Sequence, residues 1–533
     1  MMDRLIPISL ILLSTLTHVF AQSSTTAPVP TGIPIQGDYT GPLRPRVHYS
    51  PPKGFMNDPN GLFKDSNGTW HLYYQYNPTD VVAGNQHWGH ATSPDLYTWT
   101  NQPIALFPPN STSGVFSGSI VTDPGNTSGF FPNTTNGVVA IYTLNTPEKQ
   151  TQEIAYSFDD GYTFTPYAGN PVLDVNSKQF RDPKVVRYGD NWVMVIAFAA
   201  EYVIGIYTSP DLKTWTHASN VSHVGFLGVQ YECPNLVELP IRSGDNSSNG
   251  RGADEEKGWV LTISINPGAP LGGSITQYFP GEFNGTHFTP HDGATRLSNF
   301  GKDDYAGQFF YNQSVSIGWA SNWEYTNLVP TAKEGWRSSM TLPRENYLVD
   351  TGVKGWELVQ EIYDLQPIVS NNLTSSRNLV NTSQEVGFGD GNGTAVYFDL
   401  NITLPTNITF SPYASINFTF STASSGEQLK GGYILAGATP YTIWVDRGKT
   451  NGFEYPLFTE KFSASQVSLK PAQRIQGIID KSLSEIYVDN GALVGTVDVY
   501  PTAPFTKLSV GTGDLPEGSN VSLEVWELKD TWA

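Results

Sequence analysis

The chain has 533 residues and a mass of 58.4 kDa, more than a single hydrophobic core usually spans, so we expect several domains. Charged residues make up only 15% and aromatic residues 13%, and there are 51 glycines and 38 prolines; this composition excludes a coiled coil, a helical bundle or a disordered chain and favours short strands joined by tight turns. The formal charge of −19 argues against nucleic acid and anionic membranes as partners, because their phosphate groups repel an acidic protein.

The N-terminal segment carries a targeting signal. Arg4 precedes an apolar run over residues 5–16, and Val19-Phe20-Ala21 supplies small residues for cleavage, which predicts a signal peptide over residues 1–21. Residues 22–41 are rich in Ser, Thr and Pro, and we expect them to be disordered. Fifteen Asn-x-Ser/Thr sequons also favour export. The chain is therefore expected to be secreted, extracellular or associated with the cell wall, and N-glycosylated.

Residues 42–355 contain two loose repeats. The segment 93–99 (SPDLYTW) returns at 209–215 as SPDLKTW, and a weaker copy begins at Ser157. Strand-like stretches rich in aromatic and β-branched residues begin at Trp70, Trp192 and Trp259. Units of about 60 residues predict stacked or radial sheets, and roughly five of them fit a five-bladed β-propeller. A solenoid is the alternative, although no capping repeat is evident.

The pattern of apolar and polar residues changes after the propeller segment. Residues 356–371 are predicted to form a helical linker. Residues 372–533 alternate apolar and polar positions, with turn signals every eight to twelve residues, and this pattern predicts an antiparallel β-sandwich. The expected fold is therefore all-β, with a five-bladed propeller followed by a C-terminal sandwich.

Three acidic residues lie in or next to proline-containing turns: Asp58 in NDP, Asp182 in RDP and Glu232 in ECP. A single such residue is usually an ordinary turn residue, and the proline favours extended backbone. In a propeller, however, equivalent positions of different blades converge on the axis. Burial and repulsion would then separate the pKa values of the carboxylates, so that one is ionised and another protonated. Glycoside hydrolysis needs such a pair.

The segment 48–61 (HYSPPKGFMNDPNG) resembles the sucrose-binding box of the family 32 glycoside hydrolases. Further blocks of that family follow in its order: Phe116–Ser119 (FSGS), Phe180–Pro183 (FRDP), Tyr231–Pro234 (YECP), Trp319–Trp323 (WASNW) and Asp446–Gly448 (DRG). Residues 264–274 are most similar to the yeast invertases of the family. The resemblance implies a β-fructofuranosidase that hydrolyses the terminal non-reducing β-D-fructofuranoside of sucrose and short fructo-oligosaccharides, with fructosyl transfer at high sucrose.

The same resemblance implies a role for each acidic residue. Asp58 is expected to be the nucleophile that forms a fructosyl-enzyme, Glu232 the acid/base, and Asp182 the transition-state stabiliser. Such covalent catalysis retains configuration and needs the two reacting carboxyl groups roughly 5–5.5 Å apart. Cys233 is expected to be a neutral thiol beside the acid, since no paired base would activate it as a nucleophile.

The expected sugar-binding residues include polar groups for hydroxyls and aromatic groups for the ring. They are Asn57, Gln75, Trp88, Phe116, Ser117, Arg181, Gln230, Asn266 and Trp323. Arg181 is also expected to help keep Asp182 ionised, and Gln230 and Asn266 are expected to face the leaving group. Each could instead cap a turn. Residues 79–87 and 302–312 are expected to form the rim of the site.

No metal or cofactor is expected, because the sequence lacks the motifs that hold them. The expected partner is a small sugar, without nucleic acid or membrane, and the sandwich is a candidate contact for a homo-oligomer. Three alternatives stay open: an exo-inulinase or fructosyltransferase on the same scaffold, an inverting arabinan- or xylan-cleaving enzyme, and a non-catalytic carbohydrate-binding protein.

Overall fold

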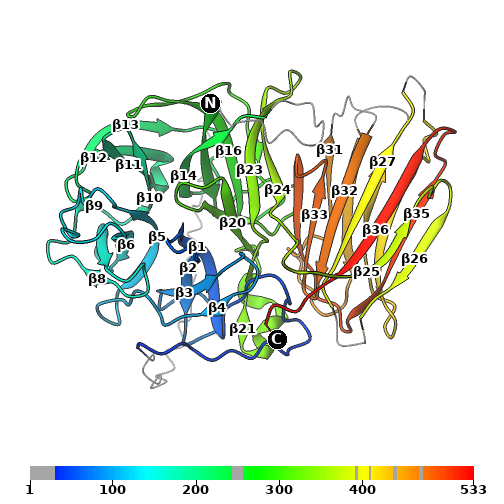
Figure 1. Ribbon diagram of the computed structural model, residues 1–533, viewed down its shortest axis with the longest axis horizontal. Coiled ribbons are helices and arrows are strands. Elements are labelled where there is room, and N and C mark those ends of the chain that lie inside the picture. Colours follow the sequence, from blue (N-terminus) through cyan, green and yellow to red (C-terminus); the bar gives the residue numbers. More distant parts are fainter. Residues whose placement is uncertain are drawn as a thin grey trace, which may run out of the picture.

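The computed structural model describes residues 31–242, 256–389, 394–406, 410–435, 441–466 and 472–532. The expected signal peptide lies outside these residues. Two all-β parts stand side by side, the first coloured blue to green and the second yellow to red in Figure 1. The first consists of five small sheets and the second of two six-stranded sheets. The prediction of a five-bladed propeller followed by a sandwich is confirmed.

Each propeller blade is built outward from its first long strand by antiparallel pairing, and a parallel pair in blade 1 also joins its first strand to a short strand from residues 336–337. Blade 1 comprises β1 (Gly54–Lys64), β2 (Trp70–Asn77), β3 (His87–Ser93), β4 (Thr100–Asn101) and β21 (Trp336–Arg337). Blade 2 comprises β5 (Gly114–Thr122), β6 (Val138–Asn145), β7 (Gln150–Ser157), β8 (Thr165–Pro166) and β9 (Leu173–Ser177). Blade 3 comprises β10 (Phe180–Tyr188), β11 (Asn191–Phe198), β12 (Val203–Ser209) and β13 (Thr216–Ser222).

The last two blades carry the insertions of the propeller. Blade 4 comprises β14 (Tyr231–Pro240), β15 (Lys257–Ile265), β16 (Ile275–Phe283), β17 (Phe288–Pro290) and β18 (Arg296–Leu297). Blade 5 comprises β19 (Tyr305–Phe309), β20 (Val315–Ala320), β22 (Ser339–Met340), β23 (Arg344–Asp350) and β24 (Trp356–Ile362). The short 3-10 helices are η1 (Ala199–Glu201), η2 (Thr326–Leu328) and η3 (Pro330–Glu334). The first strands of the blades touch in a closed ring, in the order β1, β5, β10, β14, β19 and back to β1.

The two sequence repeats correspond to two parts of a blade. The stretches that begin at Trp70, Trp192 and Trp259 lie in β2, β11 and β15, the second strands of their blades. These strands are apolar along most of their length because neighbouring blades cover both faces. The SPD segments follow the third strand, where the Ser209 hydroxyl donates to Asp211 at 3.1 Å and Asp211 accepts the next backbone N–H groups. This repeat is therefore a structural turn.

The sandwich packs two sheets face to face. One sheet contains β25 (Val369–Ser376), β36 (Asn520–Leu528), β27 (Val396–Thr403), β32 (Ala472–Asp480), β33 (Leu483–Val488) and β34 (Leu493–Asp498). The other contains β26 (Ser383–Gly387), β35 (Phe505–Gly513), β28 (Ser415–Thr422), β29 (Gln428–Ile434), β30 (Tyr441–Lys449) and β31 (Lys461–Gln466). Strand β28 alternates buried and half-buried residues, and its Phe418 ring packs on Phe398 of β27 with centroids 5.1 Å apart.

Two local predictions are wrong. The predicted helical linker begins with β24, the outer strand of blade 5, because Leu358 and Val359 face apolar partners in a sheet rather than one stripe of a helix. Residues 31–41, expected to be disordered, are mostly exposed but contact the rest of the protein: Ile35 is buried, and the Tyr39 ring stacks on Trp532 with centroids 3.9 Å apart. The aromatic partner near the C-terminus gives this segment contacts that its composition does not reveal.

The propeller and the sandwich meet across buried ion pairs. His48 lies between two sandwich carboxylates, with Nδ1 2.8 Å from Asp480 and Nε2 3.2 Å from Glu485. Arg344 of blade 5 also donates to Glu485, at 2.8 Å. Burial disfavours the charged imidazole, but these two carboxylates outweigh burial and raise the pKa of His48 to about 9. The interface therefore depends on a protonated histidine.

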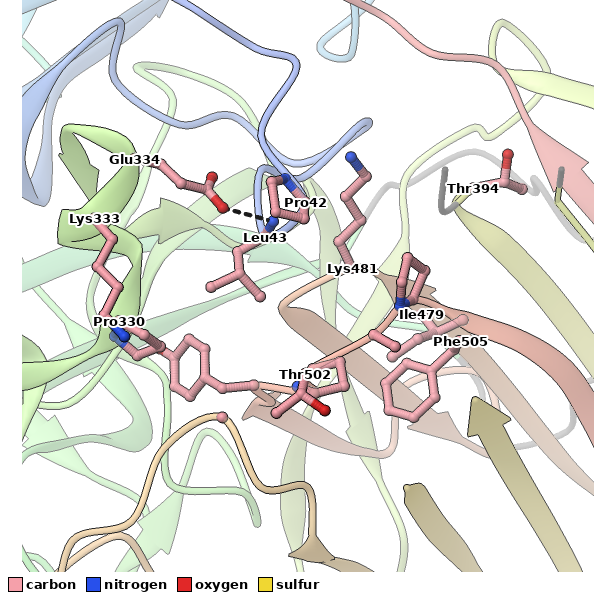
Figure 2. A pocket seen from close by; sticks show the side chains of 15 residues that line it. Pro42, Leu43, Pro330, Lys333, Glu334, Thr394, Ile479, Lys481, Thr502 and Phe505 are labelled. Atoms are coloured by element: carbon pink, nitrogen blue, oxygen red, sulfur yellow. Dashed lines mark hydrogen bonds between the residues drawn. The ribbon is translucent and has the colours of Figure 1, made fainter. Parts of the chain in front are cut away.

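A cavity of about 420 Å³ lies beside this interface. Figure 2 shows that its walls come from the N-terminal segment, from η3 and from the sandwich. Two of its charged groups already have partners within the protein: Glu334 accepts the Leu43 N–H at 2.9 Å, and Lys481 donates to the Gly41 carbonyl at 2.9 Å. None of the three acidic residues predicted to be catalytic lines it, so we assign it no part in the chemistry.

We predict that the protonated His48 makes stability pH-dependent. Its folded pKa exceeds the ordinary value of 6.5, so its contribution is complete below that pH and is lost as the pH rises through about 9. The loss is on the order of 3 kcal/mol. Melting temperatures measured across this window should fall less steeply in His48→Gln than in the wild type, whereas His217→Gln, at an exposed position, should keep the wild-type slope. Equal slopes in all three proteins would contradict the prediction.

Candidate active site

The first strand of every blade carries a two-residue bulge on the axis of the propeller. Pairing with the second strand is interrupted at residues 57–58, 116–117, 182–183, 233–234 and 306–307. The first bulge residue has a left-handed φ at Asp182 (65°), Cys233 (46°) and Ala306 (51°). The backbone at Asp182 is therefore not extended, although the proline that follows it predicted an extended conformation. A bulge re-aims side chains out of the sheet, and here residues at or next to the bulges of all five blades line one small cavity.

The three predicted catalytic carboxylates all lie at these bulges, but at three different positions. Glu232 is the last paired residue before its bulge, Asp182 is the first bulge residue and Asp58 is the second. The sequence repeat predicted that the three carboxylates occupy equivalent positions in their blades. The strand pairing shows instead that, relative to the bulge, each is shifted by one residue from the next. The carboxylates therefore stand at different heights along the axis, and a small cavity there is lined by residues of all five inner strands, including Asp182 and Ser117.

Asp58 is held by hydrogen bonds to both of its carboxyl oxygens. Ser117 donates to Oδ2 at 2.7 Å, Asn57 donates to Oδ1 at 3.1 Å, and the Cys233 thiol lies 3.4 Å from Oδ2. Burial raises the pKa of Asp58; the Ser117 hydrogen bond opposes this shift, and the charge of Glu232 adds to it. Asn57 and Ser117, both predicted to bind sugar, therefore contact the carboxylate directly.

Asp182 is the most strongly perturbed of the three. Burial raises its pKa to about 7, against the opposing charge of Arg181, and the charges of Glu232 and Asp58 add to the rise. Its Oδ2 accepts the Cys233 backbone N–H at 2.9 Å. The charge of Arg181 favours the ionised form of Asp182, in the direction expected, but the loss of hydration outweighs it. Protonated Asp182 can both donate and accept a hydrogen bond.

Glu232 lies between side chains from the two neighbouring blades. Arg181 donates to its Oε1 through Nε at 3.1 Å and Nη2 at 3.0 Å, and the Tyr305 hydroxyl donates to Oε2 at 2.5 Å. All three residues precede the bulge of their own strand, so they share one layer of the ring. The hydrogen bonds of Arg181 thus go to Glu232 rather than to the adjacent Asp182, and they fix the direction of the Glu232 carboxyl group.

Sequence reasoning missed Tyr305. It starts the inner strand of blade 5, at the position that corresponds to Arg181 and Glu232 in blades 3 and 4. The segment Tyr305-Ala306-Gly307 lacks the proline that marks the three acidic turns, so the repeat could not be recognised there. The WASNW block, whose Trp319 pairs with Tyr305 at the end of the second strand, was the available signal.

The thiol of Cys233 lies between two carboxylates. Its Sγ is 3.4 Å from Asp58 Oδ2 and 3.6 Å from Asp182 Oδ2. Burial raises the pKa of Cys233 well above its ordinary value, and the surrounding carboxylates raise it further. The residue is therefore a neutral thiol, and it also packs in an apolar cluster with Phe55 and Trp319.

Among the remaining predicted sugar-binding residues, two support the bulge of blade 2. Trp88 is fully buried in the core between blades and its indole N–H donates to the Phe116 carbonyl at 3.0 Å, so it is not a surface for a sugar ring. Gln75, 2% exposed, donates to the Val115 carbonyl at 3.1 Å. Phe116 itself is half-buried, at the bulge next to Ser117.

The other predicted residues lie around Glu232. Gln230 is half-buried and accepts Arg181 Nη2 at 2.9 Å, so it orients the arginine. Asn266 is half-buried and directly follows β15, the strand paired with the Glu232 strand. Trp323 is half-buried and packs on Trp319 with centroids 4.8 Å apart, in the cluster that contains Tyr305.

The expected rim is only partly a surface. Residues 79–87 are mostly half-buried or exposed. Lys302, Asp303 and Asp304 are instead buried, and residues 305–309 form the inner strand β19. The prediction that residues 302–312 form part of the rim is therefore wrong, because contacts with the sandwich bury the start of this segment.

The described part of the chain holds no group of three or more His, Cys, Asp or Glu side chains arranged for a metal ion. Among the same residues, no helix combines the length and apolar character that crossing a bilayer requires. The geometry of the site is thus a set of three buried or half-buried carboxyl groups with fixed hydrogen-bond partners.

Comparison with known proteins agrees with this arrangement. The glycosyl hydrolases family 32 N-terminal domain matches residues 48–361, and the family's C-terminal domain matches residues 364–527. The chain is 42% identical to Invertase 2 of Saccharomyces cerevisiae over 491 residues, which cover 86% of this chain and 90% of that protein. It is 43% identical to an extracellular exo-inulinase of Meyerozyma guilliermondii over 475 residues, covering 84% and 88%.

A solved structure shows the same fold at full length. The β-fructofuranosidase of Schwanniomyces occidentalis, complexed with fructosyl-erythritol, superposes with a TM-score of 0.84 at 37% identity, covering 94% of this chain and 100% of that one. Both halves of the chain, the propeller with its carboxylates and the sandwich, are accounted for by a single family. The chain belongs to the family 32 glycoside hydrolases.

Proposed function

We propose that this glycoside hydrolase is a β-fructofuranosidase that releases the terminal fructose of sucrose and short fructo-oligosaccharides with retention of configuration. The observation that carries the proposal is the meeting of Asp58, Asp182 and Glu232 at the bulges of three inner strands. The yeast invertases and the β-fructofuranosidase with a bound fructosyl sugar support the same substrate class. This chain would then cleave the bond between the fructosyl unit and its leaving group.

In the first step, Asp58 attacks the anomeric carbon of fructose while Glu232 gives a proton to the departing glucose oxygen. The hydrogen bonds from Asn57 and Ser117 hold the nucleophile in one orientation. Arg181 and Tyr305 hold the carboxyl group of Glu232 toward the leaving group. Fixed groups of this kind lower the barrier because they need no rearrangement during the reaction.

In the second step, Glu232 takes a proton from water, and the water attacks the fructosyl-enzyme and frees Asp58. A sugar hydroxyl in place of water gives fructosyl transfer, which we expect at high sucrose. Asp182 is proposed to bind fructose hydroxyls and to stabilise the positive charge that develops in the transition state. With its pKa raised to about 7, the protonated form can both donate to and accept from fructose hydroxyls, whereas stabilising the positive charge requires its carboxylate form.

Replacing either reacting carboxyl group should abolish most activity without unfolding the protein. Asp58→Asn removes the nucleophile and Glu232→Gln removes the proton, so kcat on sucrose should fall at least about 100-fold in each. Asp190→Asn, at an exposed turn of blade 3, should keep the wild-type rate and serves as the matched control. Near-normal turnover by either site variant, with an unchanged melting temperature, would remove the assigned role.

The hydroxyl of Ser117 should set the acid limb of the pH profile. Its hydrogen bond lowers the pKa of Asp58, so Ser117→Ala should raise that pKa and move the acid limb of kcat/KM to higher pH, by up to about one unit. Ser484→Ala removes a buried serine of the sandwich that donates to a backbone carbonyl, and it should leave the profile unchanged. A limb that moves to lower pH, or not at all, would contradict this assignment.

Sucrose is proposed as the preferred substrate, although an exo-inulinase is among the relatives of similar identity. The segment 264–274, which reaches Asn266 beside the acid strand, resembles the invertases and supports this choice. We expect kcat/KM for sucrose to exceed that for inulin, with lower activity on raffinose and kestose. A preference for inulin would support the exo-inulinase alternative.

The stereochemistry separates the proposal from an inverting hydrolase. A double displacement through Asp58 releases β-fructofuranose first, which NMR of the first turnovers detects before mutarotation. Release of the α anomer first would instead support an inverting enzyme, and absence of any reducing sugar would support a binding protein.

Secretion with N-glycosylation is part of the proposal. The extracellular exo-inulinase among the relatives supports export, and sequon asparagines such as Asn67, Asn110 and Asn284 are exposed and open to a glycan. Association of two copies through the sandwich stays a prediction, which the mass of the deglycosylated protein in light scattering would test.

A further inference from the structure

The three residues that precede and begin β19 connect the sandwich to the catalytic layer. Asp303 pairs with Arg447 of the sandwich, Asp304 pairs with Arg344, and Tyr305 donates to Glu232. We propose that the sandwich positions the acid/base of the propeller through this segment, with Arg447 as the positioning residue. The inference rests on the proposed role of Glu232.

Arg447 lies in β30 and is fully buried, with its donors directed at fixed acceptors. Nη1 donates to Asp303 Oδ2 at 2.7 Å and to the Asp498 carbonyl at 2.8 Å, and Nε donates to the Thr459 carbonyl at 2.8 Å. The guanidinium also lies 3.4 Å from the centroid of the Phe458 ring. A planar cation held on several sides fixes its carboxylate partner in place.

The neighbouring residues of this segment are anchored to the same domain. Arg344 donates to Asp304 at 2.5 Å and to Glu485 of the sandwich at 2.8 Å. The Asp303 N–H donates to the Thr496 carbonyl at 3.2 Å, so the segment follows the edge strand β34. Lys302 Nζ donates to the Leu457 carbonyl at 2.7 Å. Lys302 and Asp303 are therefore fixed by direct contacts with the sandwich, and Asp304 is fixed by Arg344, which itself donates to Glu485 of the sandwich.

The anchored backbone decides where the Tyr305 hydroxyl lies. Tyr305 is buried, and its ring packs against Trp319 with centroids 6.3 Å apart, so the side chain cannot turn independently of its backbone. A displacement of Asp303 and Asp304 would move the hydroxyl away from Glu232 Oε2 and leave the carboxyl group fixed on one side only. Small errors in the position of a proton donor are costly in rate.

This arrangement explains a motif that the carboxylate chemistry does not use. The Asp446-Arg447-Gly448 block lies in the sandwich, far along the sequence from the propeller turns. Asp446 accepts the Gly448 N–H of the same strand and pairs with Lys461, whereas Arg447 points into the propeller interface. The arginine is thus the member of the block that connects the two domains.

Leaving-group dependence tests the proposal. Departure of glucose from sucrose needs a proton from Glu232, whereas departure of nitrophenolate from 4-nitrophenyl β-D-fructofuranoside does not. Arg447→Met should therefore lower kcat/KM on sucrose by about 10- to 100-fold and on the nitrophenyl substrate by no more than about threefold. Arg447→Lys, which keeps the charge, should recover part of the loss on sucrose.

Arg474→Met is the matched control. Arg474 is a sandwich arginine that pairs with Asp399 inside its own domain, with Nε 2.9 Å from Oδ1, and its loss should leave both substrates at wild-type rates. Tyr305→Phe should show the same substrate dependence as Arg447→Met. The double variant should lose little more on sucrose than Tyr305→Phe alone, because both changes break one connection.

Equal losses of Arg447→Met on the two substrates, or the same loss in Arg474→Met, would overturn the proposal in favour of a purely structural role. The Glu232→Gln variant separates this failure from failure of the proposed function. Its kcat/KM should be far higher on the nitrophenyl substrate than on sucrose. If it is not, the acid role of Glu232 is wrong, and the inference fails with it. Should Arg447→Met not fold, Asp303→Asn removes the same ion pair and is judged by the same ratio.

Discussion

The bulge in the inner strand of each blade is the constraint on which the site depends. Regular pairing would direct alternate side chains into the spaces between blades, where apolar residues pack. Two unpaired residues per strand instead bring side chains to the propeller axis, and the left-handed backbone at Asp182 and Cys233 is part of that change. Because all five strands carry it, groups far apart in the sequence form successive layers of one ring.

Burial and hydrogen bonding compete within these layers, and the balance differs from one carboxylate to the next. Asp58 loses hydration but accepts hydrogen bonds at both oxygens. Asp182 accepts one backbone N–H, and the charge of the adjacent Arg181 does not offset its burial. Burial therefore raises the pKa of both aspartates, and the neighbouring donors and charges that oppose the rise differ between them. The neutral thiol of Cys233 separates two of them without adding charge.

Among its described residues, the sandwich has no cluster of carboxyl groups of this kind. Its contacts nevertheless reach the layer of the propeller ring that contains Glu232. Ion pairs at the interface are buried on both sides, so each charged group is costly unless its partner stays in place. His48 and Arg344 share Glu485, and Arg447 holds Asp303. The two domains thus have one preferred docking geometry, and the segment that carries Tyr305 is part of it.

The sequence by itself predicted the architecture and the carboxyl groups that meet at the axis of the propeller. Strand-forming stretches at Trp70, Trp192 and Trp259 recur at blade spacing, and the acidic turns around Asp58, Asp182 and Glu232 are local patterns that a linear reading can find. Only the tertiary structure showed that Arg181 holds Glu232 and that Trp88 supports a bulge rather than a sugar. It also showed that Tyr305 and Arg447 are connected through the residues that precede β19. Those relations depend on the offset between strands and on contacts between distant domains, and neither leaves a periodic trace along the chain.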